Sequence, residues 1–230
     1  MYDLEQVILT CGYRRTGKDT FFTKLSDDKQ IKSATTTDLF RWRIYKHPTA
    51  LHRTLDPTLT YQRIAFADSL KEEAAVRYGI PVSVPDHEKD VKRFIHYQTG
   101  DLVSSRDIHI EWGGIRRSED PDYWCKEAFK RVQFDKGCCV VTDWRYHNEA
   151  AYTHNSYDVI TVRLYRSDVP VPDRSIESEH NLDNYRTDFL LLRDDVDGEY
   201  EKAVEIFPQY IGYVPDVRDE GVSEAHRCTV

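Results

Sequence analysis

The 230-residue chain lacks the features of several protein classes. It has no apolar run long enough to cross a membrane, and its first residues have neither the basic start nor the apolar centre of a secretory signal. It has no polybasic tract, and its net charge of -8 comes from acidic and basic residues that are mixed along the sequence. We therefore expect a soluble cytoplasmic protein that binds neither membranes nor nucleic acids.

Cysteine spacing excludes the common zinc motifs. The five cysteines form no Cys-x-x-Cys pair, and Cys138 and Cys139 are adjacent in an apolar run, where a strand would direct them to opposite faces. This usage is typical of a reduced protein without a structural zinc site. The length of the chain suits one domain of ordinary size.

Short apolar runs rich in Val and Ile alternate with helical patterns, as in a parallel sheet covered by helices. The predicted strands are 7–11, 63–67, 138–142, 159–164 and, more weakly, 188–192. The predicted helices are 18–25, 69–78, 106–117, 121–134, 148–152 and 200–207. We therefore predict an α/β three-layer fold with a five-stranded, mostly parallel sheet.

Two stretches interrupt this alternation. Residues 26–62 contain three consecutive threonines and two prolines, and we predict that they form an insertion of loops and at most one helix. Residues 208–230 are polar and include Pro208, Pro215 and Gly221, and we expect a C-terminal tail that is poorly ordered. The predicted domain therefore spans residues 1–207.

The segment from Gly12 to Lys18 has the G-x-x-x-x-G-K spacing of a phosphate-binding loop, and it lies between a predicted strand and a predicted helix. Its glycines allow backbone N–H groups to face phosphate oxygens, while Lys18 and the helix N-terminus add positive charge. Asp19 stands where the usual pattern has Ser or Thr, and it either binds magnesium or compensates the helix dipole. The predicted nucleotide-binding residues are Gly12, Arg15, Thr16, Gly17, Lys18, Asp19 and Thr20.

Polar residues also follow the second and third predicted strands. Asp68 and Lys71 follow the second strand, where Lys71 is either an anion ligand or a solvated surface lysine. Asp143 follows the third strand and is a candidate magnesium ligand, with Arg145 two residues beyond it. Glu149 is predicted to clamp the Arg145 guanidinium; the alternative is a salt bridge without a ligand.

Between these sites, residues 104–129 combine arginines with aromatic residues. Arg106 offers a planar fork suited to phosphate, and Trp112 and Trp124 offer flat faces suited to a base. A single aromatic residue in this pattern belongs to a core more often than to a ligand site.

These segments together resemble the deoxynucleoside monophosphate kinase family, which is known mainly from phages and other DNA viruses. The resembling segments occur in family order: GYRRTGKDT, AFADSLKEEAAVRYGIP, Arg106 ahead of WGG, DPDYW, TDWRYHNEA and ESEHNLDNYRTDF. The chain is also similar to animal phosphomevalonate kinases, for example at Trp112-Gly113 and Ser178-Glu179. We prefer the nucleotide branch because of Ala-Phe-Ala-Asp and Asn-Glu-Ala, although Gly113-Gly114 replaces the Gly-Thr of that family.

The resemblance implies a P-loop kinase fold and phosphoryl transfer from ATP, with Mg²⁺, to a deoxynucleoside monophosphate, in the host cytoplasm if the protein is virus-encoded. In that scheme Lys18 holds the donor phosphates, and Asp19 and Asp143 position the metal. The implied catalytic residues are Lys18, Arg106, Asp143, Arg145 and Glu149, and the implied acceptor-binding residues are Asp68, Lys71, Arg106, Trp112, Trp124 and Arg145. Segment 166–184 is predicted as a lid over the site. A phosphomevalonate-type kinase and a non-catalytic nucleotide-binding protein remain alternatives, and the sequence leaves open whether a homodimer forms.

Overall fold

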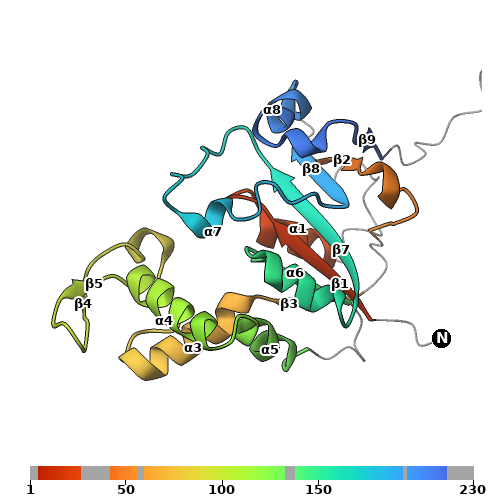
Figure 1. Ribbon diagram of the computed structural model, residues 1–230. Helices are drawn as coiled ribbons and strands as arrows, with labels where there is room; N and C mark the ends of the chain where they lie inside the picture. The colour runs from red at the N-terminus through yellow and green to blue at the C-terminus, as the bar shows by residue number, and fades with distance from the viewer. Residues whose placement is uncertain (1–4, 27–41, 56–59, 133–137, 194–195, 217–230) are drawn as a thin grey trace, which may run out of the picture.

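The apolar runs of the sequence form the middle of one sheet in the computed structural model, which describes residues 5–26, 42–55, 60–132, 138–193 and 196–216. The sheet has seven strands (Figure 1): β1 (Gln6–Cys11), β2 (Trp42–Lys46), β3 (Tyr61–Ile64), β6 (Cys138–Val141), β7 (Asp158–Tyr165), β8 (Phe189–Arg193) and β9 (Val214–Pro215). Their order across the sheet is β3-β6-β1-β7-β8-β2-β9. β2 runs antiparallel to β8 and β9, and the other pairs are parallel.

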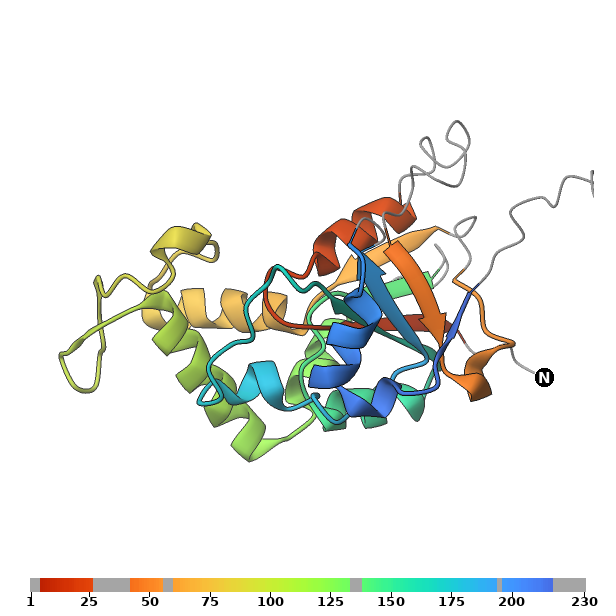
Figure 2. The ribbon, with the colours of Figure 1, turned by 90° about the horizontal axis from the view of Figure 1, so that it is seen from above.

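Helices connect these strands and cover both faces of the sheet. They are α1 (Lys18–Ser26), α3 (Phe66–Tyr78), α4 (Ser105–Glu119), α5 (Tyr123–Phe129), α6 (His147–His154), α7 (Glu177–His180) and α8 (Glu199–Ile206), with short 3₁₀ turns η1 (Pro48–Ala50), η2 (Asp86–Glu88) and η4 (Pro208–Tyr210). A small hairpin of β4 (Phe94–Ile95) and β5 (Leu102–Val103) extends with α3 and α4 away from the sheet, on the left of Figures 1 and 2. Within the described ranges, no helix combines the length and the apolar character that crossing a bilayer requires.

Alternating side chains of the central strand bury both faces of the sheet. Val7 and Leu9 of β1 pack in one core cluster with residues of α5 and α6, whereas Ile8 packs in a second cluster with Phe21 and Leu25 of α1. A third cluster joins β8 to α8 on the face opposite α1. Because successive strand residues point to opposite faces, a strand that is buried on both faces has a continuous run of apolar residues in the sequence. The predicted α/β arrangement with a mostly parallel sheet is therefore confirmed.

The predicted number of five strands is wrong, because β2, which runs antiparallel to β8, and the edge strand β9 extend the sheet to seven. β2 lies within the predicted insertion 26–62, and β9 lies within the predicted tail 208–230. Tyr210 and Tyr213 are buried, so the start of the predicted tail packs against the domain. Residues 27–41, 56–59 and 217–230, which make up much of the predicted insertion and tail, lie outside the described residues.

The second predicted strand also ends early, and the following helix α3 begins at Phe66 rather than at residue 69. The reason is a cap from elsewhere in the chain. The N-cap residue Ala65 has no capping side chain, but the Asp143 carboxylate accepts the backbone N–H groups of Phe66 and Ala67, both at 2.8 Å. These bonds satisfy N–H groups that a helix start leaves without a partner.

A buried arginine connects the sheet to the C-terminal part of the described chain. Arg163 of β7 is 1% exposed; its Nε donates to the Tyr210 hydroxyl at 2.7 Å, and its guanidinium also donates to the Leu182 carbonyl. The same guanidinium lies over the Phe207 ring. Since a buried charge is costly without partners, these contacts hold the 182 and 207–210 segments on β7.

We expect Tyr210→Phe to lower the free energy of unfolding by about 1–3 kcal/mol, because it removes the acceptor of a buried guanidinium N–H. Urea denaturation followed by circular dichroism measures this difference. Tyr97→Phe is the matched control, since Tyr97 is 52% exposed, and it should change stability by less than about 0.5 kcal/mol. Equal effects of the two substitutions would contradict the structural role of Arg163.

Candidate functional site

The carboxyl ends of the central parallel strands meet at one edge of the sheet. From β1 the chain passes to α1 on one face, whereas from β6 it passes to α6 on the opposite face. In open α/β sheets, neighbouring strands whose connections leave in opposite directions create a crevice in which ligands bind. This edge is therefore where the fold itself favours a site.

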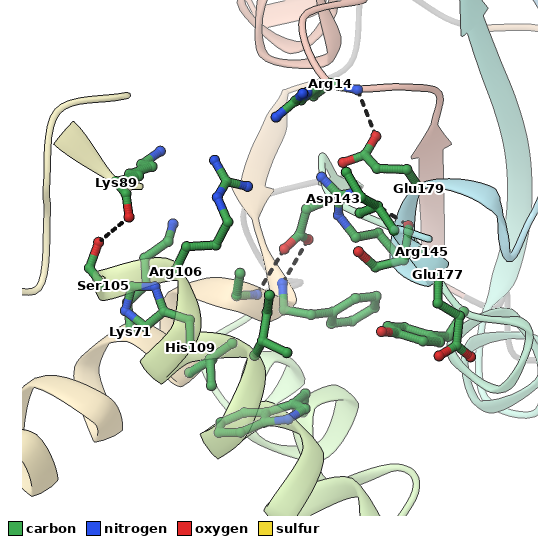
Figure 3. Close-up of a pocket in the computed structure, with 18 of the residues that line it drawn as sticks. Arg14, Lys71, Lys89, Ser105, Arg106, His109, Asp143, Arg145, Glu177 and Glu179 are labelled. Atoms are coloured by element: carbon green, nitrogen blue, oxygen red, sulfur yellow. Dashed lines mark hydrogen bonds and ion pairs between the residues drawn. The ribbon is translucent and has the colours of Figure 1, made fainter. Parts of the chain in front are cut away.

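A cavity of about 630 Å³ opens at this edge. It is lined by α3, α4, Trp124 of α5, segments 82–90 and 175–179, Arg14 after β1, and the 143–149 segment after β6 (Figure 3). Six of the predicted site residues line it: Lys71, Arg106, Trp124, Asp143, Arg145 and Glu149. The cavity thus brings together residues that are widely separated in the sequence.

The loop between β1 and α1 has a backbone conformation that favours glycine at Gly12 and Gly17. Gly12 has φ +136°, and a Cβ there would lie 2.4 Å from the Leu164 carbonyl oxygen. Gly17 has φ +98°, and Arg15 has φ 68°. The buried Thr16 hydroxyl donates to the Tyr13 carbonyl at 2.8 Å. Thr16 therefore stabilises the loop from within rather than facing the cavity.

Lys18, the first residue of α1, lies beneath this loop. Its ammonium donates to the Gly12 and Tyr13 carbonyls at 2.7 and 2.9 Å. Burial, reinforced by the positive charge of Arg145, lowers the pKa of Lys18 to about 8. Arg15 and Thr20 are exposed. A cation thus lies next to the N–H groups of a glycine loop and a helix N-terminus, an arrangement suited to anions.

Of the two predicted magnesium ligands, only Asp143 lines the cavity. The Asp19 carboxylate pairs with Arg63 at 3.1 Å, and Arg63 also pairs with Asp68, which in turn pairs with Lys71. The side chain of Asp19 is 76% exposed. Asp19 and the predicted acceptor residue Asp68 therefore belong to a network of surface ion pairs beside the cavity.

Asp143 is compatible with a magnesium ion that keeps much of its water shell. Each of its oxygens accepts one backbone N–H, from Phe66 or Ala67, which leaves further lone pairs on the carboxylate. Burial raises the pKa of Asp143. Across the described part of the chain, His, Cys, Asp and Glu side chains form no cluster of three or more that could hold a metal. Magnesium is commonly held by one or two carboxylates together with substrate phosphates, which suits this donor set.

The Glu179 carboxylate bridges the glycine loop and Arg145. One oxygen lies 2.6 Å from Nη1 of Arg145, and the other accepts the Arg14 backbone N–H at 2.8 Å. Burial opposes ionisation of Glu179, but the charge and hydrogen bond of Arg145 keep its pKa below the usual value. An anion therefore occupies the point where a loop N–H and a guanidinium converge. The sequence offered Ser178-Glu179 only as part of a resemblance, so this role was missed.

The predicted clamp of the Arg145 guanidinium by Glu149 is wrong. Glu149 lies in the first turn of α6, and its carboxylate accepts the backbone N–H groups of Arg145 and Tyr146 at 2.8 and 3.0 Å. It is 3% exposed, and burial raises its pKa to about 8. Glu149 thus fixes the backbone at Arg145, whereas Glu179 holds the guanidinium.

Trp112 and Trp124, which were predicted to offer flat faces to a base, have different surroundings in the structure. Trp124 is buried, lines the cavity and donates its indole N–H to the Gly113 carbonyl at 3.3 Å. Trp112 is absent from the cavity lining; it lies between the guanidinium groups of Arg77 and Arg116 and donates to Glu73 at 3.2 Å. The structure thus leaves Trp124 at the site and gives Trp112 a packing role.

At the other end of the cavity, α4 contributes Arg106 and His109 (Figure 3). Arg106 pairs with Asp90 at 2.5 Å. His109 was not predicted as a site residue, because a single histidine in a helical pattern carries no signal of its own. It lies one turn after Arg106, so both side chains face the same side of the helix.

No protein-family model matches the sequence, and a search of curated proteins finds no significant relative. The functional inference therefore depends on the residues and geometry of this cavity.

We expect Gly12→Ala to lower the free energy of unfolding by about 2 kcal/mol or more, because it combines an unfavourable φ with a clash against the Leu164 carbonyl. Chemical denaturation measures the loss. Gly114→Ala is the control: Gly114 lies within α4 with open space at its Cβ, and alanine there should stabilise by about 0.5–1 kcal/mol. A Gly12→Ala protein as stable as the wild type would contradict this loop conformation.

The raised pKa of Glu149 makes stability dependent on pH. Between the ordinary pKa of a glutamate and about 8, the folded protein holds a proton that the unfolded chain releases, so stability falls as pH rises through this range. We expect Glu149→Gln to abolish this contribution. The free energy of unfolding of the variant minus that of the wild type should then rise by more than about 1 kcal/mol from pH 5 to pH 8.5. Urea denaturation at each pH measures both free energies. Parallel pH profiles of the two proteins would contradict the prediction.

Proposed function

We propose that the protein has a P-loop kinase fold and transfers the γ-phosphoryl group of ATP to the phosphate of a deoxynucleoside monophosphate. The observation that carries the proposal is the position of the Glu179 carboxylate, which accepts a loop N–H and pairs with Arg145. A phosphate oxygen can use the same two donors. The donors lie beside Lys18, at the carboxyl edge of a parallel sheet, which is where phosphates bind in α/β folds.

On the donor side, the loop between Gly12 and Lys18 supplies backbone N–H groups and an ammonium for the β and γ phosphates of ATP. Thr20 is exposed in the first turn of α1 and can donate to a phosphate oxygen. Asp143 would hold Mg²⁺ through its water shell. Magnesium bound there would neutralise charge on the donor phosphates.

On the acceptor side, Arg145 and Arg106 line the same cavity and offer planar forks for the acceptor phosphate, with Lys71 nearby. A phosphate monoester is largely ionised near neutral pH, so its oxygen needs no strong general base. The chain must instead align two anions that repel each other and stabilise the charge on the transferred group. A cavity rich in cations within a protein of net charge -8 meets that demand.

Segment 175–179 also supports the proposal. It lines the cavity between the loop and Arg145, and it belongs to the predicted lid 166–184. If bound phosphates accepted the Arg14 N–H and paired with the Arg145 guanidinium, Glu179 would lose both partners and could accept hydrogen bonds from other donors. A segment that covers bound phosphates also excludes water, which limits wasteful hydrolysis of ATP.

The test is an ADP-release assay with the full chain, ATP and Mg²⁺, over the four common deoxynucleoside monophosphates, the ribonucleotides and phosphomevalonate. We expect ADP and the matching diphosphate only with nucleoside monophosphates. Phosphorylation of phosphomevalonate alone would favour the alternative of a phosphomevalonate-type kinase. ATP binding without transfer to any acceptor would favour a non-catalytic nucleotide-binding protein.

We expect Lys18→Ala to lower kcat/KM at least about 100-fold, because it removes a charge that acts on the transferred group. Lys130→Ala is the control, since the Lys130 side chain is 67% exposed and pairs with Glu127 on the surface. Both variants should keep the melting temperature of the wild type within a few degrees. Near-normal activity of the Lys18 variant would contradict the phosphate-loop assignment.

A further inference from the structure

The cavity has two chemically different ends (Figure 3). The loop end contains Arg14, Asp143, Arg145 and Glu179, and the α4 end contains Lys71, Lys89, Arg106 and His109. The proposed phosphoryl transfer uses the loop end together with Arg106, but it gives no role to His109.

The His109 ring makes no hydrogen bond or ion pair within the described part of the chain, and its Nε2 is completely buried. A buried polar atom without a partner costs free energy, so such atoms are rare in folded proteins. Here the unpartnered atom belongs to a side chain that lines the cavity. A ligand in the cavity that reaches this nitrogen would satisfy it.

The charged neighbours of His109 are already paired, unlike His109 itself. Lys71 pairs with Asp68 at 3.3 Å, Arg106 pairs with Asp90 at 2.5 Å, and Lys89 pairs with Asp86. Burial, followed by the charges of Lys71, Lys89 and Arg106, lowers the pKa of His109 to about 4. The ring is therefore an uncharged group with one donor and one acceptor nitrogen near neutral pH.

Apolar side chains also line the cavity beside these charged groups. Val82 and Val84, from the segment that leads into η2, line the cavity together with Leu70 of α3 and Ile110 of α4. A ligand body that fits here is flat or apolar, with a polar edge for His109. A heterocyclic base has both properties, whereas a carboxylate or a second phosphate would use only the lysines and arginine.

We propose that His109 is a specificity-determining residue that hydrogen-bonds to the polar edge of a heterocyclic base on the acceptor, bound between α4 and the apolar side chains of Val82 and Val84. The inference rests on the proposed function, because it assumes that the acceptor phosphate lies toward Arg106 and Arg145. It adds that the protein recognises the acceptor by a contact with its base. One residue then contributes to the choice among nucleotides.

The test uses the full chain with His109→Ala, His109→Gln and the control His87→Ala, whose side chain is 80% exposed in the wild type. KM and kcat are measured with each deoxynucleoside monophosphate and with 2-deoxyribose 5-phosphate, which has no base. For the best base, we expect His109→Ala to raise KM at least about tenfold, with the KM for ATP unchanged and partial recovery in His109→Gln. The KM for 2-deoxyribose 5-phosphate should not change. His87→Ala should match the wild type throughout.

Equal KM values for wild type and His109→Ala would overturn the inference, as would an equal rise with the base-free phosphate, which would indicate contact with the sugar or the phosphate. Melting temperatures of the His109 variants should equal that of the wild type, because the ring makes no internal hydrogen bond. A large loss of stability would indicate a packing role instead and would also overturn it.

Calorimetric titration separates this inference from the proposed function. If the wild type phosphorylates no acceptor, the kinase proposal fails, yet the same nucleotides can be titrated into both proteins without ATP. Binding to the wild type that weakens tenfold in His109→Ala supports the base contact on its own. Absence of nucleotide binding to the wild type overturns it.

Discussion

One carboxylate, that of Glu179, connects the segments on which the candidate site depends. It accepts a backbone N–H from the loop after β1, pairs with Arg145 after β6, and belongs to the segment after β7. These three segments leave neighbouring strands of the sheet, so a single anion fixes their relative positions. A buried carboxylate is stable there only because it receives both a guanidinium and an N–H. The same donors make the position suitable for phosphate.

The charges of the cavity are held in place before any ligand binds. Lys71, Lys89, Arg106 and Arg145 each pair with a nearby carboxylate. The pairs of Lys71, Lys89 and Arg106 are partly exposed and contribute at most about 1 kcal/mol each, so a phosphate that replaced one of these carboxylates would do so at small cost. The pairs also restrict the long side chains to the cavity wall, which reduces the entropy lost on binding. A protein that is acidic overall can in this way present a cationic surface to an anionic ligand.

Local patterns were enough to predict the central strands and the glycine loop. The loop follows from spacing alone, because Gly12, Gly17 and Lys18 are close in sequence and their backbone conformations require glycine at the first two positions. Long-range contacts were not predictable in the same way. The cap of α3 comes from Asp143, 77 residues away, and strand β2 forms by pairing with the distant strands β8 and β9. Its sequence, Trp-Arg-Ile-Tyr-Lys, has no apolar run that would mark it as a strand.

Among the candidate site residues, too, local patterns predicted positions along the chain but not long-range contacts. Asp143, Arg145 and Glu149 could be predicted to lie together because they follow a recognisable strand, but the hydrogen-bond partners of each depend on tertiary packing. Glu149 and Glu179 are equally acidic in the sequence, and only the fold decides which of them reaches the Arg145 side chain. Trp112 and Trp124 are likewise indistinguishable as flat side chains until the helix faces are known.

The attachment of Glu179 also determines how its segment responds when an anion takes the place of the carboxylate. The segment continues to His180 and Asp183, which pair at 2.7 Å, and Asp183 accepts the Tyr13 hydroxyl at 3.2 Å. Leu182 is held on β7 by the buried Arg163. The distal part of the segment is thus anchored to the loop and the sheet independently of Glu179. Displacement of the carboxylate by a phosphate therefore changes the contacts of residues 175–179 without releasing the anchor, which confines the response to the stretch that lines the cavity.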